Sequence, residues 1–489
     1  FVSDCAPVLD AVRALDPVLV GFSLIFQNLT ARFQQLVTNL RGAGVRAHFT
    51  MGGHYPSFAY DALLRDIEGL DSVVRFEGED TLVELVETLC SGGDWRTLGG
   101  LAWRAQQGVV ANALRPGRRD LDTLPWPNRR DMKYGRGPLP AASLLGSRGC
   151  PHRCSFCSIA PFYRASGNPG RRLRDAADVA QEVEWLHRRG ARVVLFQDDD
   201  FLGGGSRGVR WAHALAGELV RRGLHERVRW RIACRSDEVS TTNLEPLKQA
   251  GLAHVYLGVE SGDAQDLADL AKRETAETHL EAKKVLEQLE LSFDFGFMLL
   301  TPWSDLDSAR HNLAFLRELA GDGAAALGFC RTLPYAGTPV AERLAAEGRL
   351  IPGWQADYAF LDTRLDALWA WLYETLNHRN QHPDGTRNAL SMLLFEAGVA
   401  LPRHPRDPEH RARVRAVTAL ANQVVCDVVE AAMDHVASCE RPVAPDDRFL
   451  TWLAEHHSKE DARIRADLAW ICELRAQQNA EDCRAAEQV

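Results

Sequence analysis

The chain has 489 residues, enough for about two to four domains of ordinary size. Apolar residues make up 46% and charged residues 25%, which excludes a disordered chain, a collagen-like repeat and a disulfide-stapled miniprotein. The net charge of −9 argues against a nucleic-acid partner. No signal peptide or apolar run of membrane-spanning length is visible. We therefore expect a globular cytoplasmic protein without a nucleic-acid or membrane partner.

Residues 1–95 predict an N-terminal α/β domain in which helices and strands alternate. The chain opens on a helical segment at 3–15, and apolar strands then alternate with amphipathic helices, at 15–27, 31–44, 45–53, 60–70, 71–79 and 79–89. This alternation is typical of a doubly wound, Rossmann-like parallel sheet. Because the chain does not open on a strand, we expect the first strand–helix unit of that fold to be absent from this sequence.

The remaining chain divides into three regions by composition and periodicity. Residues 96–140 are rich in Gly, Arg and Pro and predict a linker with a small hairpin at 101–113. Residues 141–345 contain six strand–helix units and predict a partial (β/α)6 TIM barrel, whose active residues lie at the carboxyl ends of the strands. Residues 346–489 are helical by period and predict a C-terminal helical domain.

Eleven cysteines are many for an intracellular enzyme, and three of them are clustered. Cys150, Cys154 and Cys157 have the spacing C-x3-C-x2-C in the string GSRGCPHRCSFCSI. The other eight are isolated, and we expect them to be small packing residues. An alternative is a second metal cluster on four of the isolated cysteines, Cys426, Cys439, Cys472 and Cys483.

Three thiolates this close together can face one point and bind a metal centre. Structural zinc sites and ferredoxin clusters take four ligands. A [4Fe–4S] cluster held by Cys150, Cys154 and Cys157 therefore leaves one iron open to a small molecule. The alternative is a zinc site in which His152 is the fourth ligand.

The string SRGCPHRCSFC, followed by a (β/α)6 pattern, resembles the radical S-adenosylmethionine (SAM) enzymes. This resemblance implies that the three cysteines ligate three irons of a [4Fe–4S] cluster. It also implies that the fourth iron chelates the amine and carboxylate of SAM, and that the reduced cluster cleaves SAM to a 5′-deoxyadenosyl radical. The electron would come from a donor such as flavodoxin or ferredoxin.

The resemblance also implies a set of SAM contacts. Three consecutive acids, Asp198 to Asp200, would repel one another if buried without a cation or hydrogen-bond donor. A charged Glu after an apolar strand is seldom there for packing. The expected SAM-binding residues are Phe156, Asp198, Asp199, Arg235, Glu260 and Ser261.

The loop at Pro302 and Trp303 departs from the glycine-rich turn of the family, which leaves the SAM contacts there undefined. Tyr335 and Gly337 resemble the family's loop after the sixth strand.

The strings VGFS, MGGHYPSF and FEGEDTL resemble the cobalamin (B12)-binding domain that is fused to many radical SAM enzymes. Gly52 and Gly53 permit close approach of the backbone, either to a cobalamin nucleotide tail or simply in a strand–helix turn. Ser23 is the expected partner of the dimethylbenzimidazole. The string D-x-H-x-x-G, whose His ligates cobalt, does not occur in this sequence. Either its segment is missing, or cobalt has no His ligand, or the domain is vestigial.

Three functions remain open. The first is a cobalamin-dependent radical SAM methyltransferase that methylates an unactivated carbon of a small metabolite or natural-product precursor. The second keeps the cofactors but catalyses a rearrangement or an oxidative cyclisation. The third is a corrinoid or iron–sulfur carrier without turnover. The sequence identifies neither the substrate nor any catalytic residue beyond the cluster and the SAM site.

Overall fold

The computed structural model describes residues 5–129, 139–168, 170–399, 407–439, 443 and 447–487. Contacts divide the chain into two compact units, which are described separately. Unit 1 comprises residues 1–119, 151–170 and 333–358. Unit 2 comprises residues 120–150, 171–332 and 359–489.

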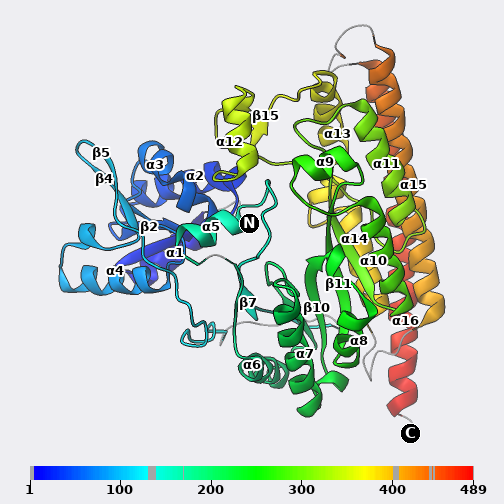
Figure 1. Cartoon of the computed structure of the whole chain (residues 1–489), viewed down its shortest axis with the longest axis horizontal. Coiled ribbons are helices and arrows are strands. Elements are labelled where there is room, and N and C mark those ends of the chain that lie inside the picture. Colours follow the sequence, from blue (N-terminus) through cyan, green and yellow to red (C-terminus); the bar gives the residue numbers. More distant parts are fainter. Residues whose placement is uncertain are drawn as a thin grey trace. The chain divides into compact units, whose positions relative to one another are not determined.

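Unit 1 contains a five-stranded sheet in the order β1-β2-β3-β4-β5. The first three strands, β1 (Leu19–Ser23), β2 (His48–Gly52) and β3 (Ser72–Val74), run parallel. Apolar side chains such as Phe22, Phe49 and Met51 form its core together with residues of α3. The helices of this unit are α1 (Ala6–Leu15), α2 (Thr30–Gly42), α3 (His54–Asp66), α4 (Glu79–Ser91), α5 (Ile159–Ala165) and α12 (Pro339–Ala346) (Figure 1).

The hairpin predicted at 101–113 is present, but it belongs to this sheet. Strand β4 (Leu101–Ala105) pairs antiparallel with β3, and β5 (Gly108–Ala111) pairs antiparallel with β4. The sheet is therefore mixed: its three parallel strands are extended by an antiparallel hairpin, which the sequence placed in the region after the sheet. The reason is that the half-buried hairpin can complete its backbone hydrogen bonds against the edge of β3.

Unit 2 contains the six predicted parallel strands in the order β13-β12-β11-β10-β9-β6. These strands are β6 (Ala141–Leu144), β9 (Val193–Phe196), β10 (Arg229–Arg235), β11 (Leu252–Glu260), β12 (Ser292–Leu300) and β13 (Cys330–Arg331). The connecting helices are α6 (Ala176–Arg188), α7 (Ser206–Arg221), α8 (Thr241–Gln249), α9 (Ala264–Asp269), α10 (Ala276–Gln288) and α11 (Leu306–Ala320). This half-barrel confirms the predicted fold class.

Side chains alternate between the two faces of the half-barrel, as strand geometry requires. On β11, Val255, Leu257 and Val259 are fully buried, whereas Tyr256 and Gly258 on the opposite face are only half-buried. The half-buried face is thus available to polar groups. It ends at Glu260, at the carboxyl end of the strand.

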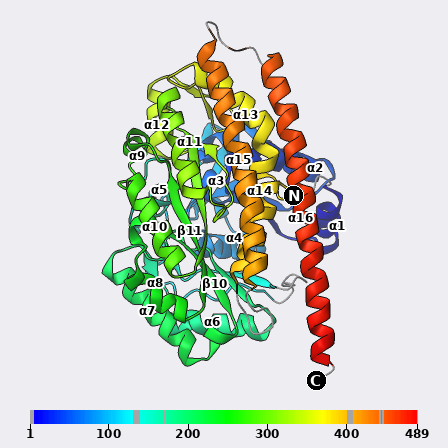
Figure 2. The same cartoon turned by 90° about the vertical axis from the view of Figure 1, so that its right-hand side faces the viewer.

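The C-terminal region of unit 2 is helical, as predicted: α13 (Arg364–Gln381), α14 (Thr386–Gly398), α15 (Pro408–Ser438) and α16 (Arg448–Glu487). Helix α14 packs against β11 and β12, and α15 and α16 lie side by side (Figures 1 and 2). By length and composition alone, α15 could cross a membrane. However, half of its apolar stretch is buried inside the protein, as is usual for a core helix.

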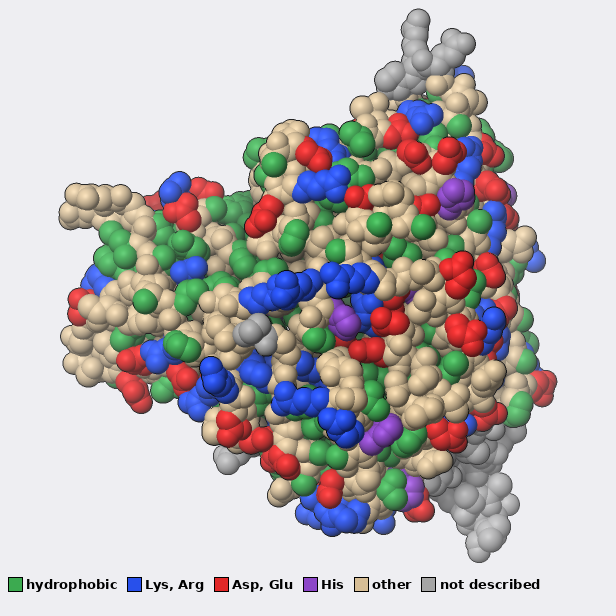
Figure 3. Space-filling view, viewed as in Figure 1, with side chains coloured by type: hydrophobic (Ala, Val, Ile, Leu, Met, Phe, Trp, Pro, Cys, Tyr) green, Lys and Arg blue, Asp and Glu red, His purple; other side chains and the backbone are tan. Residues whose placement is uncertain are grey.

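Ion pairs join α11 to α15 on the surface, where Arg317 contacts Glu430 at 2.7 Å and Arg310 contacts Asp434 at 2.8 Å. Acidic and basic side chains are accordingly interspersed along the right-hand edge of Figure 3. These exposed pairs contribute little stability individually.

Candidate functional site

The three clustered cysteines lie on one loop that follows β6, the first strand of the half-barrel. The chain leaves β6, pairs briefly as β7 (Ser147–Arg148) with β8 (Arg172–Leu173), and reaches Cys150 in unit 2. Cys154 and Cys157 belong to unit 1, where the amide of Cys157 donates to the carbonyl of Cys154 at 3.2 Å. All three are half-buried free thiols, the soft ligands that iron–sulfur clusters take.

The acid run after β9 holds the first part of this loop. Asp198 accepts a hydrogen bond from the amide of Gly146 at 3.0 Å and another from the hydroxyl of Ser147. Asp199 Oδ2 accepts from the amide of Gly149 at 2.7 Å, and the thiol of Cys150 lies 3.7 Å from Asp200 Oδ2. The hydrogen-bond donors that the sequence led us to expect for these acids are therefore groups of the loop that leads to Cys150.

Through these contacts Asp198 and Asp199 hold the start of the cysteine loop, a role that the sequence did not predict. Burial raises the pKa of the Asp199 carboxyl to about 6, against the lowering effect of the Gly149 amide. Burial also raises the pKa of Asp198, which the Ser147 hydroxyl and Arg171 oppose. Contact of either acid with SAM stays a prediction.

Two of the other predicted SAM residues meet in a buried charged cluster at the ends of β10 and β11. Arg235 contacts Asp237 at 3.0 Å and Glu274 at 3.4 Å. Glu260 lies 3.8 Å from the ammonium of Lys272, which in turn lies 3.2 Å from Glu274. Burial raises the pKa of Glu260, and Lys272 is the main group that lowers it.

Ser261 is placed differently from the expectation. Its hydroxyl is fully buried and donates to Asn312 Oδ1 at 2.8 Å. Asn312 also donates to Asp266 at 2.8 Å, and Asp266 accepts from Thr301 at 3.0 Å. The Ser261 side chain thus joins the end of β11 to helix α11. The predicted SAM contact of this side chain has no support from these contacts.

The glycine pair at the end of β2 is explained mainly by packing in unit 1. Gly53 has φ = +116°, and a Cβ atom there would lie 2.3 Å from the carbonyl oxygen of Leu24. The close approach predicted for a nucleotide tail is therefore made by the protein's own backbone after β1. A Cβ at Gly52 would meet Val74 O at an ordinary 3.4 Å.

Ser23 is exposed at the carboxyl end of β1, and the next residues include two exposed apolar side chains. Ile25 is 53% and Phe26 49% exposed, and the ring centroid of Tyr335 lies 6.1 Å from that of Phe26. A polar hydroxyl beside exposed apolar groups fits a large, partly apolar ligand. The predicted contact of Ser23 with cobalamin stays a prediction.

The remaining residues singled out in the sequence are placed as follows. Phe156 is half-buried in unit 1, and its contact with adenine stays a prediction. Gly337 lies against Phe58, whose ring a Cβ would meet at 2.3 Å. The Pro302 carbonyl accepts a hydrogen bond from Leu361 at 3.2 Å, and the Trp303 amide donates to Thr301 Oγ1 at 3.3 Å.

The idea of a second cluster on the C-terminal cysteines finds no support. Cys426 is buried in α15, where burial raises the pKa of its thiol to about 11, and Cys472 is exposed on α16. Within the residues that the structure describes, the three potential metal ligands that lie together are Cys150, His152 and Asp200, and this group includes none of the C-terminal cysteines. Cys483 lies outside the described side chains.

Sequence reasoning missed the polar lining of the half-buried face of the half-barrel. Arg387 of α14 contacts Asp294 of β12 at 3.4 Å, and the side chains of these residues are 23% and 17% exposed. Lys272 and Glu274 were also missed. They lie within the irregular string LAKRET, in which no periodic pattern shows that a charged side chain points inward.

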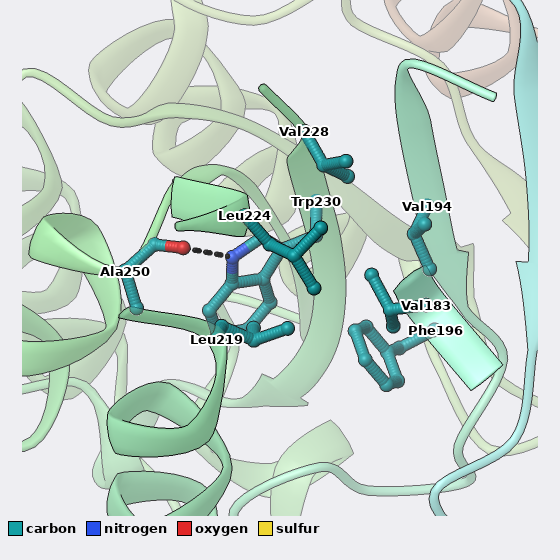
Figure 4. A pocket seen from close by; sticks show the side chains of 8 residues that line it. All are labelled: Val183, Val194, Phe196, Leu219, Leu224, Val228, Trp230 and Ala250. Carbon is teal, nitrogen blue, oxygen red and sulfur yellow. Dashed lines mark hydrogen bonds between the residues drawn. The ribbon is translucent and has the colours of Figure 1, made fainter. Parts of the chain in front are cut away.

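An apolar pocket lies between β9, β10 and their helices and is not part of this site. It is lined by Val183, Val194, Phe196, Leu219, Leu224, Val228, Trp230 and Ala250 (Figure 4). Its one polar feature, the indole of Trp230, donates to the carbonyl of Ala250 at 3.0 Å. It contains no group for chemistry and is a gap in core packing.

Known protein families match both regions. Residues 144–307 match the Radical SAM superfamily, and residues 2–86 match the B12 binding domain. The radical SAM match favours the iron–sulfur interpretation of the three cysteines over zinc. The radical SAM domain confirms the predicted [4Fe–4S] cluster and SAM, and the B12-binding domain confirms the predicted cobalamin.

Three relatives support this assignment. An uncharacterized methyltransferase from Pyrococcus horikoshii is 25% identical, with 71% of this chain and 73% of the relative aligned. A hopanoid C-3 methylase from Methylococcus capsulatus is 29% identical over 67% of this chain and 62% of its own length. An anaerobic magnesium-protoporphyrin IX monomethyl ester cyclase from Cereibacter sphaeroides is 28% identical over 59% of this chain and 47% of its own length.

Two solved structures share the fold. The cobalamin-dependent SAM radical enzyme OxsB superposes with a TM-score of 0.64 at 16% identity, covering 99% of this chain and 74% of OxsB. The radical SAM methyltransferase TsrM from Kitasatospora setae superposes with a TM-score of 0.59 at 18% identity, covering 89% of this chain and 91% of TsrM. These structures share the fold, and the two family matches together with the cysteine loop show that the chain contains a B12-binding domain followed by a radical SAM domain.

Proposed function

We propose that the protein is a cobalamin-dependent radical SAM methyltransferase that methylates an unactivated carbon of a small molecule. The observation that carries the proposal is the cysteine loop, which follows the first strand of a parallel half-barrel in a chain that also contains a B12-binding domain. Methyl transfer is preferred because two of the three relatives described above are named as methyltransferase or methylase.

The protein's own residues would position the cofactors and exclude water. Cys150, Cys154 and Cys157 would hold the cluster, and Asp199 would hold the loop through the Gly149 amide. The cluster, SAM and cobalamin, when bound, would supply a 5′-deoxyadenosyl radical and a transferable methyl group.

The SAM contacts are part of the proposal. Glu260 and Arg235 end adjacent strands, where active residues of such barrels lie. Glu260 would accept a hydrogen bond from the ammonium or ribose of SAM. Arg235 already forms ion pairs with Asp237 and Glu274, so it would act mainly by holding the carboxyl end of β10 in place.

The proposal includes a cytoplasmic setting and a reduced flavodoxin or ferredoxin as electron donor. The substrate would be a small molecule that contacts the half-buried face of the half-barrel. That face carries Tyr256, Asp294 and Arg387, so the substrate would have at least one polar group.

A second candidate is a radical rearrangement or oxidative cyclisation with the same cofactors. The similarity to a protein named as a cyclase favours it. A third candidate, a carrier without turnover, has no specific observation in its favour.

Product analysis separates these functions. The protein is reconstituted anaerobically with iron, sulfide and hydroxocobalamin and is then given SAM and a strong reductant. Methyl transfer predicts both S-adenosylhomocysteine and 5′-deoxyadenosine, whereas 5′-deoxyadenosine alone would favour the rearrangement or cyclisation. If neither product forms while cobalamin stays bound, the result favours a carrier. A Cys154→Ala variant is the matched control and should lose the brown cluster absorbance.

A further inference from the structure

The loop between α9 and α10 places a lysine inside the protein. Lys272 has a side chain only 4% exposed, and its ammonium lies 3.2 Å from Glu274 Oε2 and 3.8 Å from Glu260 Oε1. A buried ammonium is unfavourable unless anionic partners compensate for its lost hydration. The two glutamates provide that compensation, so Lys272 and Glu260 form part of one electrostatic unit.

Backbone strain is concentrated around this ion pair. Ala271 and Arg273, the two neighbours of Lys272, have φ of +51° and +59°. Glu260, at the other end of the pair, has φ = +72°. Residues other than glycine rarely adopt this left-handed backbone conformation. Such backbone strain persists only where surrounding contacts hold the residue in place. Three residues in this region therefore lie at or beside the two side chains that form the ion pair.

The same loop is also tied to the neighbouring strand. Arg235 Nη2 donates to the carbonyl of Lys272 at 2.8 Å. Gly258 makes room for the pair, because a Cβ there would lie 3.0 Å from Lys272 Nζ and 3.1 Å from Glu260 Oε1. The loop thus fixes the carboxyl ends of both β10 and β11, where the proposed SAM contacts lie.

The charged and titratable groups that face Glu260 come from four elements. Tyr256 is on the same strand, Arg235 is on β10, Cys330 is on β13, and Lys272 and Glu274 are on the loop. The cations among these groups are Arg235 and Lys272, and the Lys272 ammonium lies 3.8 Å from the Glu260 carboxylate. Without Lys272, Glu260 would remain buried beside Glu274 with much less compensation.

We propose that Lys272 is a positioning residue that keeps the Glu260 carboxylate charged and oriented toward SAM. This inference rests on the proposed function, because it requires Glu260 to contact SAM. Lys272 itself would not touch SAM or the reacting atoms.

The test is equilibrium binding of SAM to the anaerobically reconstituted full chain without reductant, at pH values from 6 to 9. We expect Lys272→Met to weaken SAM binding about 10- to 100-fold near neutral pH, the range for a lost hydrogen bond to a charged group. The substitution removes the main group that lowers the pKa of Glu260, so this pKa should be higher in the variant. The affinity for SAM should therefore recover as the pH rises above the pKa of Glu260 in the variant. Lys272→Arg should retain most of the affinity. The control is Lys284→Met, at an exposed lysine paired with Glu281.

A double-mutant cycle with Glu260→Gln decides whether Lys272 acts through Glu260. We expect Glu260→Gln to weaken binding and to abolish both the further effect of Lys272→Met and its pH dependence. Equal losses from Lys272→Met in the two backgrounds would overturn the inference. Unchanged binding in Glu260→Gln would also overturn it, although methyl transfer would stand if wild-type protein still forms both S-adenosylhomocysteine and 5′-deoxyadenosine.

Folding of each variant is checked by thermal unfolding. If Lys272→Met does not fold, Lys272→Gln replaces it, since Gln retains a hydrogen-bond donor toward Glu274 without the charge. The same loss of affinity and the same recovery at high pH are expected. Wild-type affinity across the pH range in this variant would overturn the inference.

Discussion

The backbone amide of Gly149 donates a 2.7 Å hydrogen bond to the carboxylate of Asp199, so the acid run after β9 holds the residue next to the first cluster cysteine. Asp198 and Asp200 contact the same loop at Ser147 and Cys150. A short, buried connection between two adjacent strand ends thus restrains the start of the cysteine loop. The position of Cys150 depends on it.

Replacing Asp199 by Ala should therefore lower the amount of cluster that the protein holds. The variant loses a charge-assisted hydrogen bond worth about 1.5–3 kcal/mol, so the loop becomes less ordered before metal binds. We expect clearly fewer irons per chain after reconstitution and faster bleaching in air. Asp199→Asn retains an acceptor and should lose less.

The matched control for Asp199 is Asp175→Ala. Asp175 also accepts hydrogen bonds from backbone amides, those of Ala177 and Asp178 at 2.9 and 3.0 Å, but at the start of α6. This variant should lower helix stability and leave iron content unchanged. An Asp199→Ala protein with the iron content of wild type would show that the loop does not need this restraint.

Gly53→Ala should destabilise unit 1 and reduce cobalamin retention. The new Cβ would lie 2.3 Å from Leu24 O, and φ = +116° is unfavourable for Ala, so we expect a loss of roughly 1–3 kcal/mol. Gly52→Ala is the neighbouring control, because its Cβ meets only Val74 O at 3.4 Å. Urea unfolding and bound cobalamin absorbance measure both effects. Equal stability of the two variants would contradict the packing explanation.

The stability of unit 2 should fall as pH decreases below about 6.5. Burial lowers the pKa of both His254 and His279 to about 3, against 6.5 for an ordinary His. The unfolded chain binds these protons first, so stability is complete above pH 6.5 and is lost progressively toward pH 3. Each residue contributes about 1.4 kcal/mol per pH unit within that range.

Urea unfolding between pH 5 and 8 tests this dependence. His254→Gln and His279→Gln should each reduce the slope of the unfolding free energy against pH by about one proton. The exposed His311→Gln is the control, with a side chain that is 72% exposed. If the protein with both substitutions keeps the wild-type slope of unfolding free energy against pH, other groups cause the acid sensitivity.

The sequence predicted the features that depend on local pattern. The spacing of Cys150, Cys154 and Cys157 and the six strand–helix units of the half-barrel were visible because thiol spacing and hydrophobic period are local properties. The hairpin at 101–113 was visible too, but its pairing with β3 was not, because pairing depends on which sheet edge is open.

The site itself was only partly predictable for the same reason. Glu260 was recognised by its place at the end of an apolar strand, but its partner Lys272 lies twelve positions further along and is turned inward by strained backbone. Ser261 was assigned to SAM by motif, whereas its hydroxyl is turned toward Asn312, 51 residues away. Side-chain direction after a strand end depends on tertiary contacts that a single sequence does not display.

The central claim is that the cysteine loop supports radical cleavage of SAM, and the most direct measurement is 5′-deoxyadenosine formation by the anaerobically reconstituted full chain. We predict that wild-type protein with SAM and reductant forms 5′-deoxyadenosine and that the Cys150→Ala, Cys154→Ala and Cys157→Ala variants do not. A wild-type protein that holds four irons per chain and binds SAM, yet forms no 5′-deoxyadenosine on reduction, would contradict the claim.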